Sequence, residues 1–425
     1  MAGRFTLSRQ AAPVPVTHPA SASLATNPWT VVAATTAVQA LASATTLSVP
    51  TIAPRLAEML GVSPALIGYQ TTFIYSGAMA TSVIGGAFVR RLGAGRASQA
   101  ALVLAILGAL LVIGGQLWTI ALGSIVMGLG YGLTNPAASH LLMRFARGPR
   151  LNLIFSIKQT GVPWGGMLAG LMLPPVALAF GWRWAVALVA VLALGLLLAL
   201  ALARRQWDDD RDPTHGLRQN PFAAVLLVWR SRPLRYLSFA SMALSLTQMC
   251  VLAFMTTLLV SEAGFGLVEA GFVVAIMQVA GVLGRVGWGL VADRIGDGFI
   301  TLMVVTGLAV LACLAASQLT PAWPAWAVYG VGALFGSTAV GWNGVFMAEV
   351  ARQAPPDRIG VATGGCMMLT FSSIIFGPAL FGIVSVAIGS YALTYLVVAG
   401  VASLGGLSLV VARRVARAGA AVPRT

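Results

Sequence analysis

The feature that most constrains this chain is a series of twelve mostly apolar runs, each about 20 to 27 residues long, separated by charged or Pro/Gly-rich breaks. A helix needs about 20 mostly apolar residues to cross the hydrocarbon core of a bilayer. Charged residues make up only 9% of the chain, whereas a soluble domain carries about 25%. We therefore predict an all-α membrane protein with spans near 29–52, 64–88, 98–117, 119–143, 151–177, 184–203, 235–261, 268–290, 299–318, 324–349, 359–385 and 391–412.

Arginine is distributed unevenly among the segments that connect these runs. If both ends of the chain are cytosolic, the cytosolic segments hold 22 arginines and the outer loops hold only Arg55 and Arg183. The positive-inside rule then predicts cytosolic termini in a multi-pass protein of a bacterial-type inner or plasma membrane. The same asymmetry accounts for the net charge of +15, because arginines on the cytosolic side are attracted to the anionic cytosolic leaflet. We thus expect membrane lipid, and no nucleic acid, as a partner.

One connecting segment is much longer than the others. Residues 204–234 carry several arginines and four aspartates, which predicts a cytosolic linker between an N-terminal six-helix bundle at 29–203 and a C-terminal six-helix bundle at 235–413. Residues 1–28, which are rich in Ala, Pro and Ser, are predicted to form a disordered cytosolic tail. Residues 414–425 are predicted to form a second, short cytosolic tail.

The two halves of the chain share a short repeat. GAFVRRLG at residues 86–93 follows the second span, and GLVADRIG at residues 289–296 follows the eighth. GLVADRIG resembles the signature loop of the major facilitator superfamily, and the resemblance extends over residues 29–413 through the twelve spans and the central linker. It implies two pseudo-symmetric six-helix bundles, the major facilitator fold, that carry a ligand by alternating access.

The resemblance also implies which residues form the cytosolic gate. In this superfamily the loop aspartate helps to hold the gate closed, and Asp293 inherits that role, against helix starts near Arg147 or Arg150. Arg90 occupies the aspartate position of the first loop, so the first half cannot make the same contact, and the simpler interpretation of Arg90 is a topology charge. The predicted gating residues are Gly289, Asp293, Arg294, Gly296 and Arg91.

Two cations fall inside spans without an acid at their depth. Lys158, the only lysine of the chain, lies in FSIKQTGVPWGG of span five, and Arg285 lies in span eight; all eleven acids lie in loops or at span ends. Because a charge within the bilayer is costly, such residues usually face a cavity on a substrate path. The superfamily fold places spans five and eight beside each other across the central cavity, and Arg285 resembles the carboxylate-contacting arginine of monocarboxylate and oxalate/formate transporters. We therefore predict an anion site.

Structural alternatives stay open for several of these residues. Arg285 precedes Gly289 by one turn and could snorkel to the cytosolic interface. GVPWGG at 161–166 indicates a bend and a close helix contact rather than an antiporter motif. His140, near the cytosolic end of span four, is a candidate for proton coupling, with a structural hydrogen bond as its alternative. Other polar residues either complete the pocket or bond between helices: Gln39, Tyr75, Asn135, Gln159, Gln248, Gln278, Asn343 and Trp342.

Together these features predict a secondary active or facilitative transporter of small organic anions, carboxylates above all. We expect no enzyme activity, no cofactor and no metal, because GLGYG at 128–132 lies inside a span rather than after a strand and the three cysteines are scattered through apolar runs. Two alternatives stay open, a drug/proton antiporter and a non-transporting membrane sensor. The absence of an acid within the spans counts against export of a cationic drug. A monomer is the expectation from the superfamily.

Overall fold

The structure is a computed structural model, and it describes residues 27–52, 56, 58, 60, 61, 64–145, 150–214, 216 and 223–420. Over these residues it is built from helices and contains no strand. Twelve helical segments are long and apolar enough to cross a membrane. The predicted fold class, an all-α membrane protein with twelve spans, is confirmed.

The first half of the chain supplies six spans. They are α1 (Pro28–Thr51), α3 (Pro64–Leu92), α4 (Ala94–Ile113), α5 (Leu117–Phe145), α6 (Leu151–Gln159) continued by α7 (Gly161–Phe180), and α8 (Trp182–Trp207). A short helix, α9 (Ala223–Arg230), lies within the predicted linker. Several of the spans, such as α3 and α8, continue beyond the predicted apolar run, because their arginine-bearing last turns stay helical.

The second half repeats this plan. Its spans are α10 (Arg232–Ser261), α11 (Leu267–Ile295), α12 (Gly298–Ala316), α13 (Ala325–Phe335) continued through η2 (Gly336–Val340) into α14 (Asn343–Gln353), α15 (Ile359–Ile388) and α16 (Tyr391–Ala420). The segment η2 is a π-helix, and such single-turn insertions often occur at functional sites. Because twelve spans lie between them, the start of α1 and the end of α16 lie at the same end of the molecule, which we call the terminus end.

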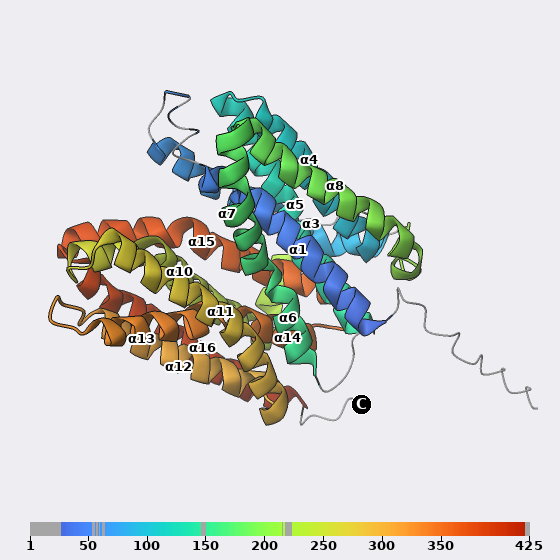
Figure 1. Cartoon of the computed structure of the whole chain (residues 1–425). Helices are drawn as coiled ribbons and strands as arrows, with labels where there is room; N and C mark the ends of the chain where they lie inside the picture. Colours follow the sequence, from blue (N-terminus) through green and yellow to red (C-terminus); the bar gives the residue numbers. More distant parts are fainter. Residues whose placement is uncertain are drawn as a thin grey trace, which may run out of the picture.

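The two bundles pack together at the terminus end and diverge towards the opposite end (Figure 1). One buried apolar cluster joins residues of both bundles, among them Phe155 of α6 and Phe346 of α14. Two further clusters are confined to single bundles, one around Val186 of α8 and one around Tyr395 of α16. Among the described residues, burial of apolar side chains in a common cluster therefore joins the bundles where the shared cluster lies.

Close backbone contacts seal this terminus end. A Cβ atom on Gly86 of α3 would overlap the backbone of Val361 of α15, and one on Gly344 of α14 would overlap Ser156 of α6. Only glycine lets helix backbones approach so closely, as in other membrane helix pairs. Both contacts run between the two bundles, so the interface is tight enough to close off this end.

Candidate functional site

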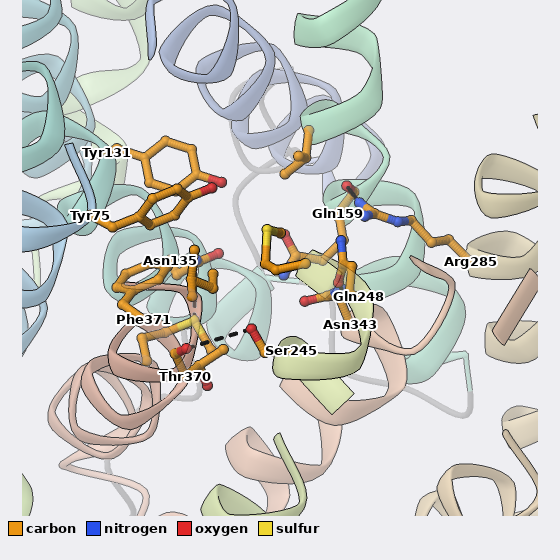
Figure 2. Close-up of a pocket in the computed structure, with 14 residues that line it drawn as sticks. Tyr75, Tyr131, Asn135, Gln159, Ser245, Gln248, Arg285, Asn343, Thr370 and Phe371 are labelled. Carbon is orange, nitrogen blue, oxygen red and sulfur yellow. Dashed lines mark hydrogen bonds between the residues drawn. The ribbon is translucent and has the colours of Figure 1, made fainter. Parts of the chain in front are cut away.

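A small cavity lies between the bundles, next to the shared apolar cluster (Figure 2). Its volume is about 60 Å³. Since one water molecule needs roughly 10–15 Å³ of such space, the cavity fits a ligand of only a few non-hydrogen atoms. Both bundles line it, through Tyr75, Tyr131, Asn135, Gln159, Val162, Ser245, Gln248, Met249, Arg285, Asn343, Met367, Thr370, Phe371 and Ile374.

Arg285 of α11 reaches this cavity from the C-terminal bundle (Figure 2). Its side chain is only 2% exposed, so it does not snorkel to the surface. Nε donates a hydrogen bond to the carbonyl oxygen of Val340 at 3.0 Å, and Nη1 donates to the carbonyl oxygen of Gln159 at 2.5 Å. A guanidinium has five N–H donors, so donors remain for a ligand.

Lys158 lies one layer behind the cavity wall. Its Nζ donates to the amide oxygens of Asn135 at 2.5 Å, Gln39 at 2.8 Å and Gln159 at 3.3 Å. These three neutral acceptors match the three N–H donors of an ammonium group. Among the residues that the structure describes, no carboxylate forms a salt bridge with Lys158 or with Arg285. The described residues therefore do not neutralise the positive charge of the site.

Gln159 connects the two cations. Its side-chain oxygen accepts from Lys158 and its backbone oxygen accepts from Arg285. In a regular helix that backbone oxygen would accept the N–H four residues later, which is the position of Pro163. Proline has no N–H, so the carbonyl of Gln159 is free for Arg285. The proline of GVPWGG thus creates the contact that holds the arginine.

An interruption of span ten supplies the second acceptor. The helix changes to the π-form in η2 and passes through a turn at residues 341–342 before α14 begins. Val340 at the end of η2 accepts from Arg285, and Ser337 accepts from the indole N–H of Trp288 at 2.7 Å. Gly284 allows this approach, since a Cβ there would overlap the backbone of Ser337. Irregular backbone in both bundles therefore orients one guanidinium.

The orientations of two side-chain amides in the cavity wall follow from neighbouring groups that can only donate hydrogen bonds. An ammonium and an indole N–H only donate, so the oxygen of Gln159 must face Lys158 and the oxygen of Gln248 must face Trp342, from which it accepts at 3.1 Å. No described residue accepts a hydrogen bond from the NH₂ group of either glutamine. Because both glutamines line the cavity, it offers N–H donors beside a cation.

Aromatic rings form the wall opposite Arg285 (Figure 2). Tyr75, Tyr131 and Phe371 stand with ring centroids 5.6 to 6.2 Å apart, within the range of favourable edge and tilted contacts. A ligand in the cavity would lie between these rings and the guanidinium. Flat apolar surface on one side and cationic donors on the other suit a small, planar or compact anion.

The predicted site residues fall into three groups. Tyr75, Asn135, Gln159, Gln248, Arg285 and Asn343 line the cavity. Three predicted residues lie behind its wall: Lys158, Gln39 and Trp342. Lys158 donates to Asn135 of the lining and to Gln39, and Trp342 donates to Gln248 of the lining. Gln278 is exposed and is not part of the lining. Sequence reasoning missed the lining residues Tyr131, Val162, Ser245, Met249, Met367, Thr370, Phe371 and Ile374; the only signal for Tyr131 was its place in GLGYG within a span.

The predicted gating loop packs on the other bundle at the terminus end. Asp293 accepts from the backbone N–H groups of Asn152 at 3.0 Å and Leu153 at 2.9 Å, in the first turn of α6. A carboxylate is stabilised there by the unpaired N–H groups and the positive end of the helix dipole. Gly289 fits against Ser156 of the same helix.

The remaining gating and coupling candidates make fewer contacts. Gly296 ends α11 in the left-handed conformation with φ of 70°, which glycine adopts without strain. Arg294 is exposed, and neither its side chain nor that of Arg91 forms a hydrogen bond or ion pair with another described residue. His140 lies outside the cavity lining and contacts Asp210 of the linker, with Nε2 2.8 Å from Oδ2. Its role in proton coupling stays a prediction.

Comparisons with known proteins agree with this architecture. The family model of the Major Facilitator Superfamily matches residues 32–378, so the chain belongs to the major facilitator superfamily, a family of transporters rather than enzymes. Among solved structures, the chain resembles the human organic anion transporter MFSD10 (TETRAN), with a TM-score of 0.72, 14% identity and coverage of 91% of this chain and 100% of that one. It also resembles FucP in the outward conformation, with a TM-score of 0.71, 15% identity and coverage of 89% and 97%.

A shorter match links the chain to a curated protein. Over 111 residues it is 36% identical to the probable nitrate/nitrite transporter NarK2 of Mycobacterium tuberculosis, in both strains CDC 1551 / Oshkosh and ATCC 25618 / H37Rv. This match covers 26% of the chain and 27% of NarK2. The chain thus matches only about a quarter of the length of its curated relatives.

Proposed function

We propose that this transporter moves a small anion across the membrane by alternating access, with the cavity at Arg285 as its binding site. The observation that carries the proposal is the pair of buried cations joined by Gln159 without a carboxylate partner in the described structure. Positive charge buried in the membrane without a counter-ion is unfavourable. A bound anion would neutralise it and occupy the remaining N–H donors.

The size and lining of the cavity narrow the class of anion. A volume of about 60 Å³ favours a short carboxylate or an inorganic oxyanion over a drug-sized molecule, whose pockets are roughly 300–1,000 Å³. The sequence favours a carboxylate, while the NarK2 match supports an oxyanion such as nitrate or nitrite. Both share two or three oxygens that accept from an arginine fork, so the structure supports the shared chemistry.

The closed terminus end bears on which state of the alternating-access cycle the structure corresponds to. If the positive-inside rule holds, the arginine-rich terminus end faces the cytosol, and the structure is an outward-facing state. In this proposal Asp293 holds the cytosolic gate closed through its contact with α6. We further propose that the transporter works as a monomer whose two moving units are the bundles at 29–203 and 235–413.

Uptake into proteoliposomes tests the proposal directly. Radiolabelled formate and acetate form one arm, labelled nitrate and nitrite a second, and the cation tetraphenylphosphonium a third. Replacement of Arg285 by Gln removes charge-assisted hydrogen bonds that are worth about 1.5–3 kcal/mol each, so uptake of the anion should fall by roughly 10- to 100-fold. Lys158→Gln should weaken uptake less, because Lys158 acts through Asn135 and Gln159.

The competing function is a drug/proton antiporter. It predicts transport of the cation, dependent on a pH gradient and unaffected by Arg285→Gln or Lys158→Gln. That outcome would overturn the anion proposal. Asn343→Leu at the cavity is a matched change that removes no charge, and it separates loss of cavity shape from loss of positive charge.

A further inference from the structure

A second cavity lies at the terminus end of the N-terminal bundle, and it shares no described lining residue with the proposed anion site. Its volume is about 510 Å³, and the described residues that line it are all charged: Arg96, Arg204, Arg205, Asp208, Asp209 and Arg211. It is formed by the first turns of α4, the last turn of α8 and the start of the linker. It therefore sits where two spans leave the hydrocarbon core.

Both acids of this lining already accept hydrogen bonds or form an ion pair elsewhere. Asp208 is buried and accepts from the backbone N–H groups of Gly95 at 2.7 Å and Arg96 at 3.2 Å, which caps the start of α4. Asp209 pairs with Arg144 of α5 at 2.5 Å. The acids thus hold the linker against the bundle and neutralise little of the remaining lining.

The arginines of the lining are free by comparison. Arg204, Arg205 and Arg211 are exposed, and no described residue forms a hydrogen bond or ion pair with their guanidinium groups. The guanidinium of Arg96 makes only a long contact with Asp208, with 3.9 Å between Nε and Oδ2. A guanidinium binds phosphate oxygens in a bidentate manner, so this cluster is suited to a phosphate group.

Apolar stripes run from the arginines into the membrane. On α4, Arg96 shares a helix face with Val103, Leu107 and Leu110, since they follow at seven, eleven and fourteen residues. On α8, Arg205 shares a face with Leu198 and Leu202, and Leu202 is 89% exposed. The helix rises 1.5 Å per residue, and one leaflet contributes about 15 Å of the hydrocarbon core. Val103, Leu107, Leu198 and Leu202 therefore lie at the depth of the acyl chains of the leaflet nearer the arginines, whereas Leu110 lies deeper.

We propose that this cavity binds the phosphodiester headgroup of an anionic lipid, whose acyl chains lie along the exposed stripes of α4 and α8. The α4–α8 pair is held together by their packing and by the bond from Gln99 to the carbonyl of Leu197, at 3.2 Å, so head and chain sites form one surface. The proposal requires only a membrane-spanning fold, and it stands whether the transported ligand is an anion or not.

Native mass spectrometry of the detergent-solubilised full chain tests it. The probes are phosphatidylglycerol, phosphatidylcholine with the same acyl chains, and inorganic phosphate. We expect phosphatidylglycerol to bind about tenfold more tightly than phosphatidylcholine, and the double variant Arg204→Gln/Arg205→Gln to lose this preference. Arg230→Gln/Arg232→Gln is the matched control, since it removes the same charge from exposed arginines outside the cavity, and should keep the preference.

A second pair of substitutions tests the chain-binding half. Leu198→Ala/Leu202→Ala keeps every charge and should weaken phosphatidylglycerol binding severalfold. Equal losses in the arginine double variant and its control would overturn the proposal in favour of diffuse surface charge. Displacement of phosphatidylglycerol by millimolar inorganic phosphate, with no effect of the leucine pair, would instead assign the cavity to a free anion and overturn the lipid assignment.

Discussion

The two halves of this transporter close the same end of the molecule with opposite chemistry. In the second half, Asp293 of α11 caps the first turn of α6 in the other bundle. At the equivalent place in the first half, Arg90 of α3 points to Asp357, just before α15, with 3.4 Å to its carbonyl oxygen and 3.8 Å to its carboxylate. The loop side chain is therefore an acid in the second-half contact and a base in the first-half contact.

The difference shows that the repeat does not preserve the charge of this loop side chain. Asp293 bonds to backbone N–H groups that lack other partners, whereas Arg90 and Asp357 are 37% and 61% exposed and lose most of their attraction to solvent screening. What both halves share is close backbone packing, at Gly86 in one and at Gly289 in the other. We therefore expect the second-half contact to contribute most of the electrostatic closure.

The largest effect is expected from Asp293→Ala. It removes an acceptor from two backbone N–H groups at a helix start, which should cost the closed state about 2–3 kcal/mol and shift the gate equilibrium about 30- to 150-fold. Spin-label distances between the exposed ends of α8 and α16 should lengthen. Asp293→Asn keeps one acceptor oxygen and should shift the distances less; an unchanged distance in both variants would contradict the role of the cap.

A smaller effect is expected from Pro163→Ala, which alters how the first half holds the arginine of the second. The alanine N–H would compete with Arg285 for the carbonyl of Gln159, at a cost near the value of one hydrogen bond, about 1 kcal/mol. Affinity for the proposed anion should fall roughly fivefold, as measured by calorimetry on the purified protein. Pro174→Ala in the same helix α7 is the control and should leave affinity unchanged.

Arg90→Gln should have a still smaller effect. An exposed ion pair contributes about 0–1 kcal/mol, so the spin-label distances that lengthen in Asp293→Ala should remain near those of the unaltered protein. High salt should reproduce the effect of Arg90→Gln, because it screens exposed pairs. An opening as large as that of Asp293→Ala would show that the two contacts are equivalent after all.

The smallest effect concerns how stability depends on pH through two aspartates at the terminus end, Asp208 at the start of α4 and Asp297 at the start of α12. Burial raises the pKa of Asp208 in spite of the N–H groups of Gly95 and Arg96, whereas for Asp297 burial is outweighed by Arg413, Ile300 and Arg417, which hold its pKa below the usual value. The charged form of Asp208 therefore costs stability above the unfolded pKa near 4, and this cost disappears as pH falls. Asp297 stabilises the fold above that pKa and loses its contribution as pH falls through its lower folded value.

Apparent melting temperatures between pH 6 and pH 3 should separate the two aspartates. Asp297→Asn should flatten the loss of stability at the acid end, and Asp208→Asn should flatten a gain at slightly higher pH, each by about a degree or two. Parallel curves for the two variants would contradict the opposite signs.

Hydrophobic run length was enough to predict the twelve spans, because a bilayer imposes one minimum length on every one of them. The position of Lys158 and Arg285 could also be anticipated, since few charges are found within spans. Rotation and packing could not: Gln278 lies two turns before Arg285 on the same face of α11, yet it is exposed because it lies towards the diverging end. The lining by Phe371 and Met367 depends on how α15 packs on the other bundle, which no local pattern records.

The contact between Arg285 and residue 159 has a consequence for genetics. Its acceptor is a main-chain oxygen, which every amino acid carries, so no substitution at position 159 deletes it. Gln159→Ala would remove a partner of Lys158 and leave the anchor of the arginine in place. A saturation screen at position 159 would therefore report on the side-chain amide alone. The role of the main-chain oxygen would be detected through changes at its neighbours, Pro163 and Arg285.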